Sequence, residues 1–444
     1  MRMEKDKIGE LELENDKLYG IQTTRAVSNF ALKYKKTNMQ LIYAIVTVKK
    51  AAALTYKKLG IGKENFYSAI SDACDFILEG KADDAFVTDA LQGGAGTSAN
   101  MNVNEVIANL SLKSLGFEYG RYDIIHPLDD VNRGQSTNDV YPTALRIAAI
   151  RMLRKLSDCC AKLQQALQLK ENEFENIPKL GRTELMDAIP ITLGQEFGSY
   201  AQAIARDRWR LYKVEERLRQ VNIGGTAVGA GNNAERKYRF KVIEELRELT
   251  DIGLAAAEYP MDITQNNDVF VEVSGLLKAL SVNLMKISND LRLMNSGPKG
   301  GLAEITLPPL QMGSTIMPGK VNPVIPEMVM QVSMKVSAND YAISMAASHG
   351  EFELNAFLPL IAEAILESLE LLTNAAEIFR RKCIELIKPN KERCSELLEN
   401  SYAFATAYTP YLGYDAVSRI IEESEGDLGK AKEILNKADK NTNE

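Results

Sequence analysis

The sequence contains only two histidines, His126 and His349, among its 444 residues. A histidine-rich zinc site is therefore excluded, and so is a mechanism that needs two histidines in one pocket. Five cysteines are scattered without any C-x-x-C pair, and their odd number indicates reduced, mostly structural thiols. Neither G-x-G-x-x-G nor G-x-x-x-x-G-K-[ST] occurs, so the dinucleotide and P-loop fingerprints are both absent.

Dense basic runs and long apolar runs are also absent. The formal net charge is -7, which argues against a nucleic-acid partner. No apolar segment approaches the length of a membrane span, so we expect no membrane partner. The first residues, MRMEKDKIGELELEND, are charged and lack an apolar signal core, and we therefore expect a cytoplasmic protein.

What the sequence does contain is long helical periodicity. Apolar residues recur at helical spacing over 39–59, 65–81, 266–296 and 357–388, and for some 25 residues after Pro142. Strong alternating strands and a βαβ rhythm are missing, so the predicted fold class is mainly α. Several helices are apolar over more surface than one bundle covers, which predicts an oligomer that fuses helix bundles.

One loop, residues 313–322 with the sequence GSTIMPGKVN, combines unusual components. Its proline and glycines disfavour a regular element. The Ser314 hydroxyl, free backbone amides, the Lys320 cation and the Asn322 carboxamide are the parts of an anion-binding, proton-abstracting site. The alternative is an ordinary connector between two helices, which is what most loops are.

Three further polar stretches each precede a long helix. Amides at a helix N-terminus lack partners and favour an anion, although simple N-capping explains such residues equally well. A glycine-rich turn, GGTAVGAGNN, follows at 224–233. The polar side chains of the three stretches are Thr97, Ser98 and Asn100; Ser136, Thr137 and Asn138; and Thr183 and Glu184.

Five blocks together resemble the aspartase/fumarase superfamily. GSTIMPGKVNP is similar to that family's signature loop, G-S-S-x-M-P-x-K-x-N-P. GGAGTSANMNVNEVIAN, HPLDDVNRGQSTNDVYPTA, GRTELMDAIPITLGQEF and GGTAVGAG resemble the other blocks, in the family's order. The stretch from NDLRLMNSGPKGG to the loop resembles the aspartate ammonia-lyase branch most. Five ordered blocks are specific, whereas each block alone is weak.

The resemblance implies a fold of three mostly helical domains, here 1–135, 136–390 with the loop 313–322, and 391–444. The central long helices would form a homotetramer in which three subunits build each active site. Family members catalyse anti 1,2-elimination across a C–N or C–O bond, without a cofactor or an essential metal. A base removes the Cβ proton, and the carbanion is stabilised as an aci-carboxylate.

The resemblance also implies residue roles. Ser314 matches the base, and loop amides and a nearby cation would stabilise its anion. Lys320 and Asn322 match the residues that hold the α-carboxylate. Arg25 matches a residue that helps to hold this carboxylate. Asn138 matches the residue beside the amino group, and Glu327 matches an acid close to the site. The hydroxyl residues around the substrate match Thr97, Ser98, Ser136, Thr137, Thr183 and Thr315.

Glu184 departs from the family, which usually carries His or Gln after the GRT block. An ionised Glu184 cannot donate a hydrogen bond, and it would repel the β-carboxylate of aspartate. Either it is protonated, sharing one proton with Glu327, or the substrate presents a donor instead. An imidazole ring with an N–H would serve, as in the substrate of ergothionases, superfamily members that release trimethylamine from a thiol-imidazole betaine. A third interpretation is that Glu184 points into an ion pair away from the substrate and is silent.

The sequence therefore predicts a carbon–nitrogen lyase. Amine elimination from an imidazole-bearing betaine such as ergothioneine ranks first, and aspartate ammonia-lyase is the alternative. Leu128 breaks the H-P-N-D pattern of fumarases, and this departure disfavours a fumarase. A catalytically silent scaffold is disfavoured by the intact Ser314, Lys320 and Asn322, and both histidines are predicted to be structural.

Overall fold

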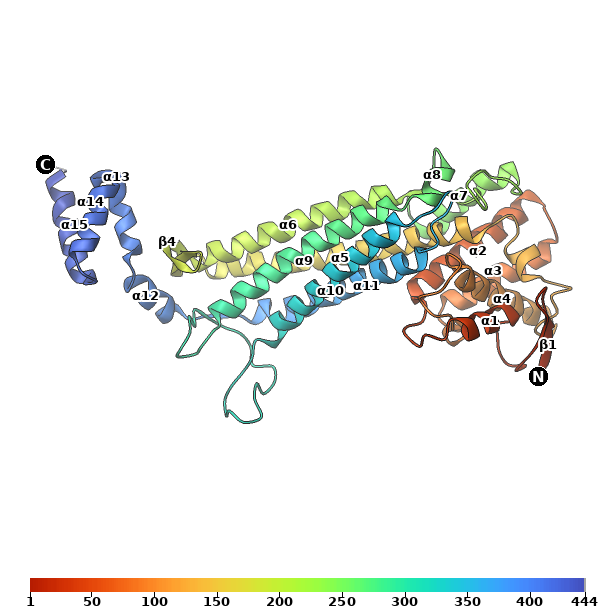
Figure 1. Cartoon of the computed structure of the whole chain (residues 1–444), viewed down its shortest axis with the longest axis horizontal. Coiled ribbons are helices and arrows are strands. Elements are labelled where there is room, and N and C mark those ends of the chain that lie inside the picture. Colours follow the sequence, from red (N-terminus) through yellow and green to blue (C-terminus); the bar gives the residue numbers. More distant parts are fainter. Residues whose placement is uncertain (443–444) are drawn as a thin grey trace. The chain divides into compact units, whose positions relative to one another are not determined.

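The computed structural model describes residues 1–442, with side chains through residue 438. It is mainly helical, which confirms the predicted fold class (Figure 1). The chain divides into two compact units: unit 1 comprises 1–157, 209–279 and 334–372, and unit 2 comprises 158–208, 280–333 and the residues from 373 onward. The three domains 1–135, 136–390 and 391–444 stay a prediction, and residues 443–444 lie outside the described part.

Five long helices contribute residues to both units. The shortest of them have 25 residues and the longest has 37. Within residues 1–442, no helix is long and apolar enough to cross a membrane. The five helices are α5 (Thr137–Glu173), α6 (Leu193–Leu218), α9 (Asp268–Met294), α10 (Val324–Ser348) and α11 (Leu358–Lys382).

Helix α5 begins earlier than the sequence predicts. The periodicity places the helix after Pro142, but this proline lies inside it, as its sixth residue. A proline cannot donate to the carbonyl four residues before it, here that of Asn138. The Asn222 side chain donates to that carbonyl instead, with Nδ2 and O 3.0 Å apart. A side chain distant in the sequence thus compensates for the lost backbone bond.

Unit 1 adds short helices and two small sheets to its parts of the long helices. Strands β1 and β2 pair antiparallel, and β5 and β6 pair parallel. Tyr56 on α2 stacks between Tyr67 of α3 and Tyr238 of α7, with ring centroids 5.6 and 4.8 Å apart. The elements are β1 (Arg2–Lys5), β2 (Glu10–Leu13), α1 (Ile21–Asn29), α2 (Met39–Leu59), α3 (Glu64–Leu78), η1 (Asp83–Ala85), α4 (Thr97–Ser114), η2 (Pro127–Val131), β5 (Gln220–Val221), α7 (Arg236–Thr250), β6 (Ala255–Ala256) and α8 (Pro260–Gln265).

Unit 2 contains a β-hairpin and a group of short C-terminal helices. Ala405, Val417 and Leu435 form a small apolar core among those helices. The chain ahead of the loop 313–322 pairs with a later segment through β7 and β8. The elements are β3 (Pro178–Thr183), β4 (Met186–Thr192), β7 (Ile305–Thr306), η3 (Ile384–Leu386), β8 (Lys388–Pro389), α12 (Lys391–Glu399), η4 (Tyr402–Tyr408), α13 (Thr409–Leu412), α14 (Tyr414–Glu423) and α15 (Leu428–Thr442).

The hairpin β3–β4 is not predicted by the sequence pattern. Thr183 pairs with Met186, so that only Glu184 and Leu185 connect the strands. Both connecting residues have positive φ, 53° and 66°, as in the tight turns that favour Asn-Gly. Glutamate and leucine give no signal for such a turn, and the hairpin therefore escapes a search for turn residues.

A fully buried carboxylate, Glu304, holds three parts of unit 2 together. The guanidinium of Arg182 on β3 lies 2.8 Å from its Oε1, and the ammonium of Lys179 lies 3.5 Å from its Oε2. The backbone carbonyl of Glu304 accepts the N–H of Asn390, which precedes α12. The hairpin, the chain leading to the loop 313–322 and the start of α12 therefore meet at one residue.

Replacing Glu304 with alanine removes the carboxylate that faces the Lys179 and Arg182 cations. Loss of one partner of a buried pair costs about 3–5 kcal/mol, and we expect a fall of that size in unfolding free energy. Urea unfolding followed by circular dichroism measures it. Glu433→Ala, which breaks an exposed pair with Lys437, is the control and should not move the midpoint. Equal midpoints for both variants would contradict the assignment.

Candidate active site

Two of the predicted blocks meet at Asp139 in unit 1. This buried carboxylate accepts the backbone N–H of Ser136 at 2.9 Å and those of Gly224 and Thr226 at 3.0 and 2.9 Å. Burial raises the pKa of Asp139 to about 6, while those N–H groups oppose the rise. The segment 136–138 and the glycine-rich turn, far apart in the sequence, are thus fixed against each other.

A third block joins the same place through Asn100 on α4. Its Nδ2 donates to the hydroxyl oxygen of Thr137 at 3.1 Å. Helix α4 begins at Thr97, whose hydroxyl donates to the carbonyl of Gly94 at 2.8 Å, and Ser98 is half-buried in the same turn. The structure therefore brings the 97–100 block to Thr137.

Asn138 and Ser136 make local contacts at the same place. The Asn138 side chain donates to the carbonyl of Ala227 at 2.8 Å, and its backbone N–H donates to the Ser136 hydroxyl oxygen at 3.2 Å. Both side chains are partly exposed. We call the cluster formed by residues 97–100, 136–138 and 224–227 the unit 1 site.

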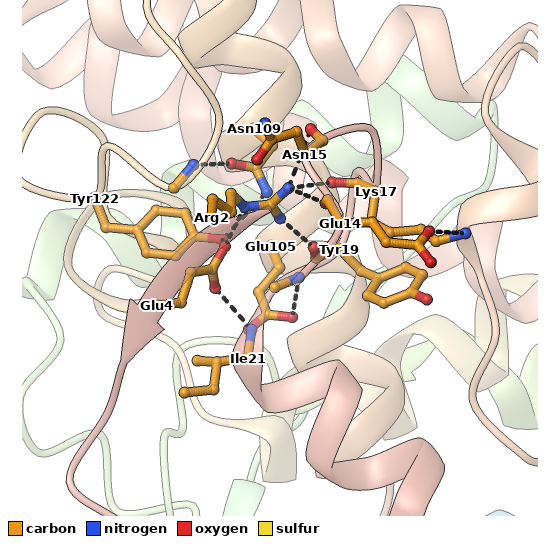
Figure 2. Close-up of polar contacts among 12 residues, drawn as sticks. Arg2, Glu4, Glu14, Asn15, Lys17, Tyr19, Ile21, Glu105, Asn109 and Tyr122 are labelled. Atoms are coloured by element: carbon orange, nitrogen blue, oxygen red, sulfur yellow. Dashed lines mark hydrogen bonds and ion pairs between the residues drawn. The ribbon is translucent and has the colours of Figure 1, made fainter. Parts of the chain in front are cut away.

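Helix α1, which carries Arg25, is held at its N-terminus by two carboxylates. Glu105 on α4 accepts the backbone N–H groups of Gly20, Gln22 and Thr23, and Glu4 accepts that of Ile21. Burial raises the pKa of Glu105 to about 7, against the effect of these bonds. Figure 2 shows Glu105 and Glu4 at the start of the helix, with Arg2 bound to Glu4 and to backbone carbonyls of the segment 14–19.

Arg25 itself forms a bidentate ion pair with Asp6. Its Nε and Nη2 lie 2.8 and 3.0 Å from the two carboxylate oxygens. The guanidinium lowers the pKa of Asp6 to about 2. The Gln22 side chain donates to the same carboxylate at 2.7 Å. Arg25 is predicted to help hold the α-carboxylate of the substrate. In this structure it binds a carboxylate of its own chain, that of Asp6.

In unit 2 two backbone N–H groups of the loop 313–322 point at the Ser314 hydroxyl. The backbone N–H groups of Ile316 and Met317 donate to the Ser314 hydroxyl oxygen at 3.1 and 2.9 Å. Two N–H groups aimed at one oxygen stabilise negative charge on it. This is the electrostatic support that a serine base requires.

The same loop is closed at its base by Gly313. The Gly313 N–H donates to the Lys320 carbonyl at 2.8 Å, and the Gly313 carbonyl accepts from the Asn322 side chain at 2.8 Å. Thr315 and Lys320 are exposed. The loop is a closed ring that presents Ser314 and Lys320 on one short segment.

The remaining predicted residues of unit 2 are on the hairpin and on α10. Thr183 and Glu184 are exposed at the hairpin tip. Glu327, in the first turn of α10, lies 3.9 Å from the Arg292 guanidinium.

Within the part of the chain that the structure describes, both histidines make contacts with residues close in the sequence. His126 Nδ1 accepts the backbone N–H groups of Leu128 and Asp129 at 3.2 Å and so caps the short turn η2. His349 Nδ1 lies 2.7 Å from the Met345 carbonyl. These contacts agree with the structural role predicted for both.

Comparison with known proteins decides the family. A family model described as lyase matches residues 9–338. Aspartate ammonia-lyase from a Bacillus species is 44% identical, covering 96% of this chain and 91% of the relative. That of Pseudomonas aeruginosa is 45% identical, covering 98% and 94%. The chain belongs to the aspartase/fumarase superfamily. It is a carbon–nitrogen lyase of the aspartase/fumarase type.

Solved structures of the superfamily share the fold. A Brucella melitensis protein described as fumarate lyase:delta crystallin, in a cobalt-bound crystal structure, gives a TM-score of 0.93 at 44% identity over 98% of both chains. Class II fumarase from Schistosoma mansoni gives a TM-score of 0.93 at 33% identity, covering 96% of this chain and 92% of that one. The aspartase/fumarase-like fold predicted from the five blocks is confirmed.

Several residues that fix the unit 1 site and helix α1 are not predicted from the sequence. Asp139 and Glu105 are acids inside helices that are otherwise assigned by apolar periodicity, and Lys49 lies in a similar place on α2. A charged residue at a buried helical position was the available signal, because such groups are buried only with partners. Asp6 gave no signal, since it lies in a charged N-terminal stretch.

Gly313→Ala tests whether the closed loop matters for elimination. A Cβ at this position would lie 2.5 Å from the Lys320 carbonyl oxygen and 2.8 Å from the Asn322 nitrogen, so the ring must open. A displacement of about 1 Å at a reacting group costs about 10²-fold in rate, and we expect a fall of that order in kcat.

The matched control for Gly313→Ala is Gly300→Ala. A Cβ at Gly300 meets no atom within 4 Å, and its backbone conformation suits alanine. Steady-state kinetics of both variants decide the question. A Gly313→Ala enzyme as fast as Gly300→Ala would show that the closed ring is unimportant.

Proposed function

We propose that this lyase converts aspartate to fumarate and ammonia. The observation that carries the proposal is 43–45% identity, over 96–98% of this chain, to aspartate ammonia-lyases from different bacteria. This reverses the order that Glu184 suggests from the sequence alone, because a single departure weighs less than similarity over 94–98% of the chain. The reaction is anti elimination of a Cβ proton and the α-amino group.

In the proposed mechanism Ser314 acts as the base. Its alkoxide, stabilised by the Ile316 and Met317 N–H groups, takes the Cβ proton of the substrate. Lys320 and Asn322 bind the α-carboxylate, with Arg25 assisting. Engagement of Arg25 requires its guanidinium to share or leave Asp6.

The electron pair left on Cβ moves into the β-carboxylate, giving an aci-carboxylate. The proposed donors to that group are hydroxyls of Thr97, Ser98, Ser136, Thr137, Thr183 and Thr315. Thr97 must release the Gly94 carbonyl, to which it donates in this structure, before it can serve. Neutral donors strengthen their hydrogen bonds as charge develops, and so stabilise the transition state more than the ground state. The pair then forms the double bond as the amine, bound by Asn138, leaves from Cα. Glu327 is the proposed acid near this site.

Glu184 favours a second candidate, amine elimination from an imidazole-bearing betaine such as ergothioneine. The carboxylate is exposed at a hairpin tip whose turn conformation is unfavourable for both connecting residues. Strained backbone conformations concentrate at functional sites. A carboxylate there accepts an imidazole N–H and repels a second carboxylate. In this candidate trimethylamine is the leaving group, and a thiourocanate is the product.

We further propose that the enzyme is a cytoplasmic homotetramer with active sites shared by three subunits. The predicted unit 1 site residues and the predicted loop and hairpin residues belong to different compact units of one chain. Large side chains on the long helices are exposed, among them Trp209 at 63% and Tyr341 at 70%. Apolar surface of this kind is typical of an association face.

A substrate panel separates the candidates. We expect aspartate to give fumarate, read by alkene absorbance, and an enzymatic assay to detect ammonia. Ergothioneine is assayed for trimethylamine, and malate is the control for C–O elimination. Turnover of ergothioneine but not aspartate would overturn the first proposal in favour of the second. Ser314→Ala should lower either activity at least about 10³-fold, since it removes the base.

Glu184→Gln asks what the hairpin tip recognises. Glutamine has the same shape and donates hydrogen bonds, so aspartate turnover should stay or rise because the repulsion is removed. Betaine turnover should instead fall about 10²-fold, the usual effect of losing one charged recognition bond. kcat/KM for both substrates is the measurement, and a loss of aspartate turnover alone would contradict both roles.

A further inference from the structure

A buried ammonium lies beneath the unit 1 site. Lys49 on α2 is fully buried, and its Nζ donates to Asn132 Oδ1 at 2.6 Å and to Gln135 Oε1 at 3.1 Å. An ammonium has three N–H donors and no acceptor. The side chain of Asn132 is therefore held with its oxygen, and not its NH2 group, toward Lys49.

The orientation of Asn132 fixes the orientation of Asn100. Asn132 Oδ1 also accepts from Asn100 Nδ2 and from Asn104 Nδ2, both at 3.2 Å. If the Asn100 amide were reversed, its oxygen would face the Asn132 oxygen without a proton between them. The NH2 group of Asn100 must therefore point to Asn132, and it is this NH2 group that donates to Thr137.

The direction of these hydrogen bonds determines where the Thr137 hydroxyl proton can point. Its oxygen accepts from Asn100, so its own proton is not directed at Asn100. Thr97 differs, because its proton is already donated to the Gly94 carbonyl. Among the described residues we find no acceptor for the Thr137 proton, which leaves it for a bound molecule.

We propose that Lys49, Asn132 and Asn100 are positioning residues that turn the Thr137 hydroxyl into a hydrogen-bond donor toward the substrate. The proposal rests on the proposed function, in which Thr137 stabilises the charge that develops on the substrate. A donor fixed in direction before the reaction needs no reorganisation when charge appears. Thr137 touches the substrate, and the other three act through it.

The network leaves buried acceptors without hydrogen bonds, which costs free energy. This cost indicates that the direction of its hydrogen bonds is important. Asn100 Oδ1 and Asn104 Oδ1 are buried and have no hydrogen-bond partner within the described part of the chain. Buried polar atoms are normally paired, so an exception calls for an explanation. Reversing either amide would turn its oxygen toward Asn132 Oδ1, and two acceptors would then face each other. The network thus leaves two acceptors unpaired and keeps the NH2 groups of Asn100 and Asn104 pointed at Asn132 Oδ1.

The network survives titration of Lys49. Burial lowers the pKa of Lys49 to about 7, and the nearby Asp139 carboxylate opposes this shift. The neutral amine still has two N–H groups, one for each of Asn132 and Gln135. The direction of the hydrogen bonds is therefore the same in both protonation states.

Asn100→Asp reverses one link of the network and keeps its shape. A carboxylate at this position accepts the Thr137 proton instead of donating to its oxygen. We expect kcat to fall about 10²-fold, the effect of removing one such donor, with KM changed less. Asn104→Asp is the matched control, because it places the same charge against the same Asn132 oxygen but does not contact Thr137. Its fall in kcat should be at least tenfold smaller.

A double variant separates positioning from general damage. If Asn100 acts through Thr137, then Asn100→Asp combined with Thr137→Val should be no slower than Thr137→Val alone. Equal losses in Asn100→Asp and Asn104→Asp, or a double variant slower by the product of the single effects, would overturn the proposal. Circular dichroism and gel filtration confirm that each variant is folded and assembled.

Neutron diffraction of the deuterated wild-type enzyme gives a test that needs no turnover. We expect deuterons of Lys49 on Asn132 and Gln135, an ND2 group of Asn100 on Thr137, and the Thr137 deuteron directed away from Asn100. A Thr137 deuteron directed at Asn100 would overturn the proposal. An enzyme inactive on the whole substrate panel would instead count against the proposed function alone, since this measurement is independent of activity.

Discussion

A cation removed from water must be surrounded by acceptors, and this constraint organises the polar part of unit 1. Lys49 on helix α2 is buried and bonded to the segment that follows η2. Asn132 and Gln135 turn their oxygens inward to meet it, and Asp139 binds backbone N–H groups on the other side of the same segment. A stretch with little regular structure is fixed because its ends are bonded to buried charges. The hydroxyls of Ser136 and Thr137 take their positions from that.

Unit 2 is also organised by a buried charge, but here the charge is negative. Glu304 is the buried charge, and Arg182 and Lys179 come to it from the hairpin. Loops and hairpin tips lack the hydrogen-bond ladder that holds a helix, so they require another source of rigidity. In both units buried charges provide it. The catalytic parts proposed for this lyase therefore depend on residues that never contact the substrate.

The helices were predictable because their signal is repeated many times along each of them. Residues 39–59 and α2 coincide, and α9 lies within the predicted 266–296. The hairpin was not predictable, because Glu184 and Leu185 occupy a turn that normally shows Asn-Gly, and six or seven residues of strand give little pattern. The blocks of the site were recognisable by residue type. Their mutual contacts, such as Asn100 with Thr137, depend on distances that no spacing in the sequence contains.

The turn at Glu184 and Leu185 also bears on how this enzyme responds to engineering. Both residues hold a backbone conformation that glycine and asparagine adopt with less strain. Selection for heat resistance alone would therefore push the hairpin tip toward those residues, as it does at other strained turns. The carboxylate proposed to govern substrate choice would be among the first groups lost. Thermal selection and substrate selection act on this turn in opposite directions.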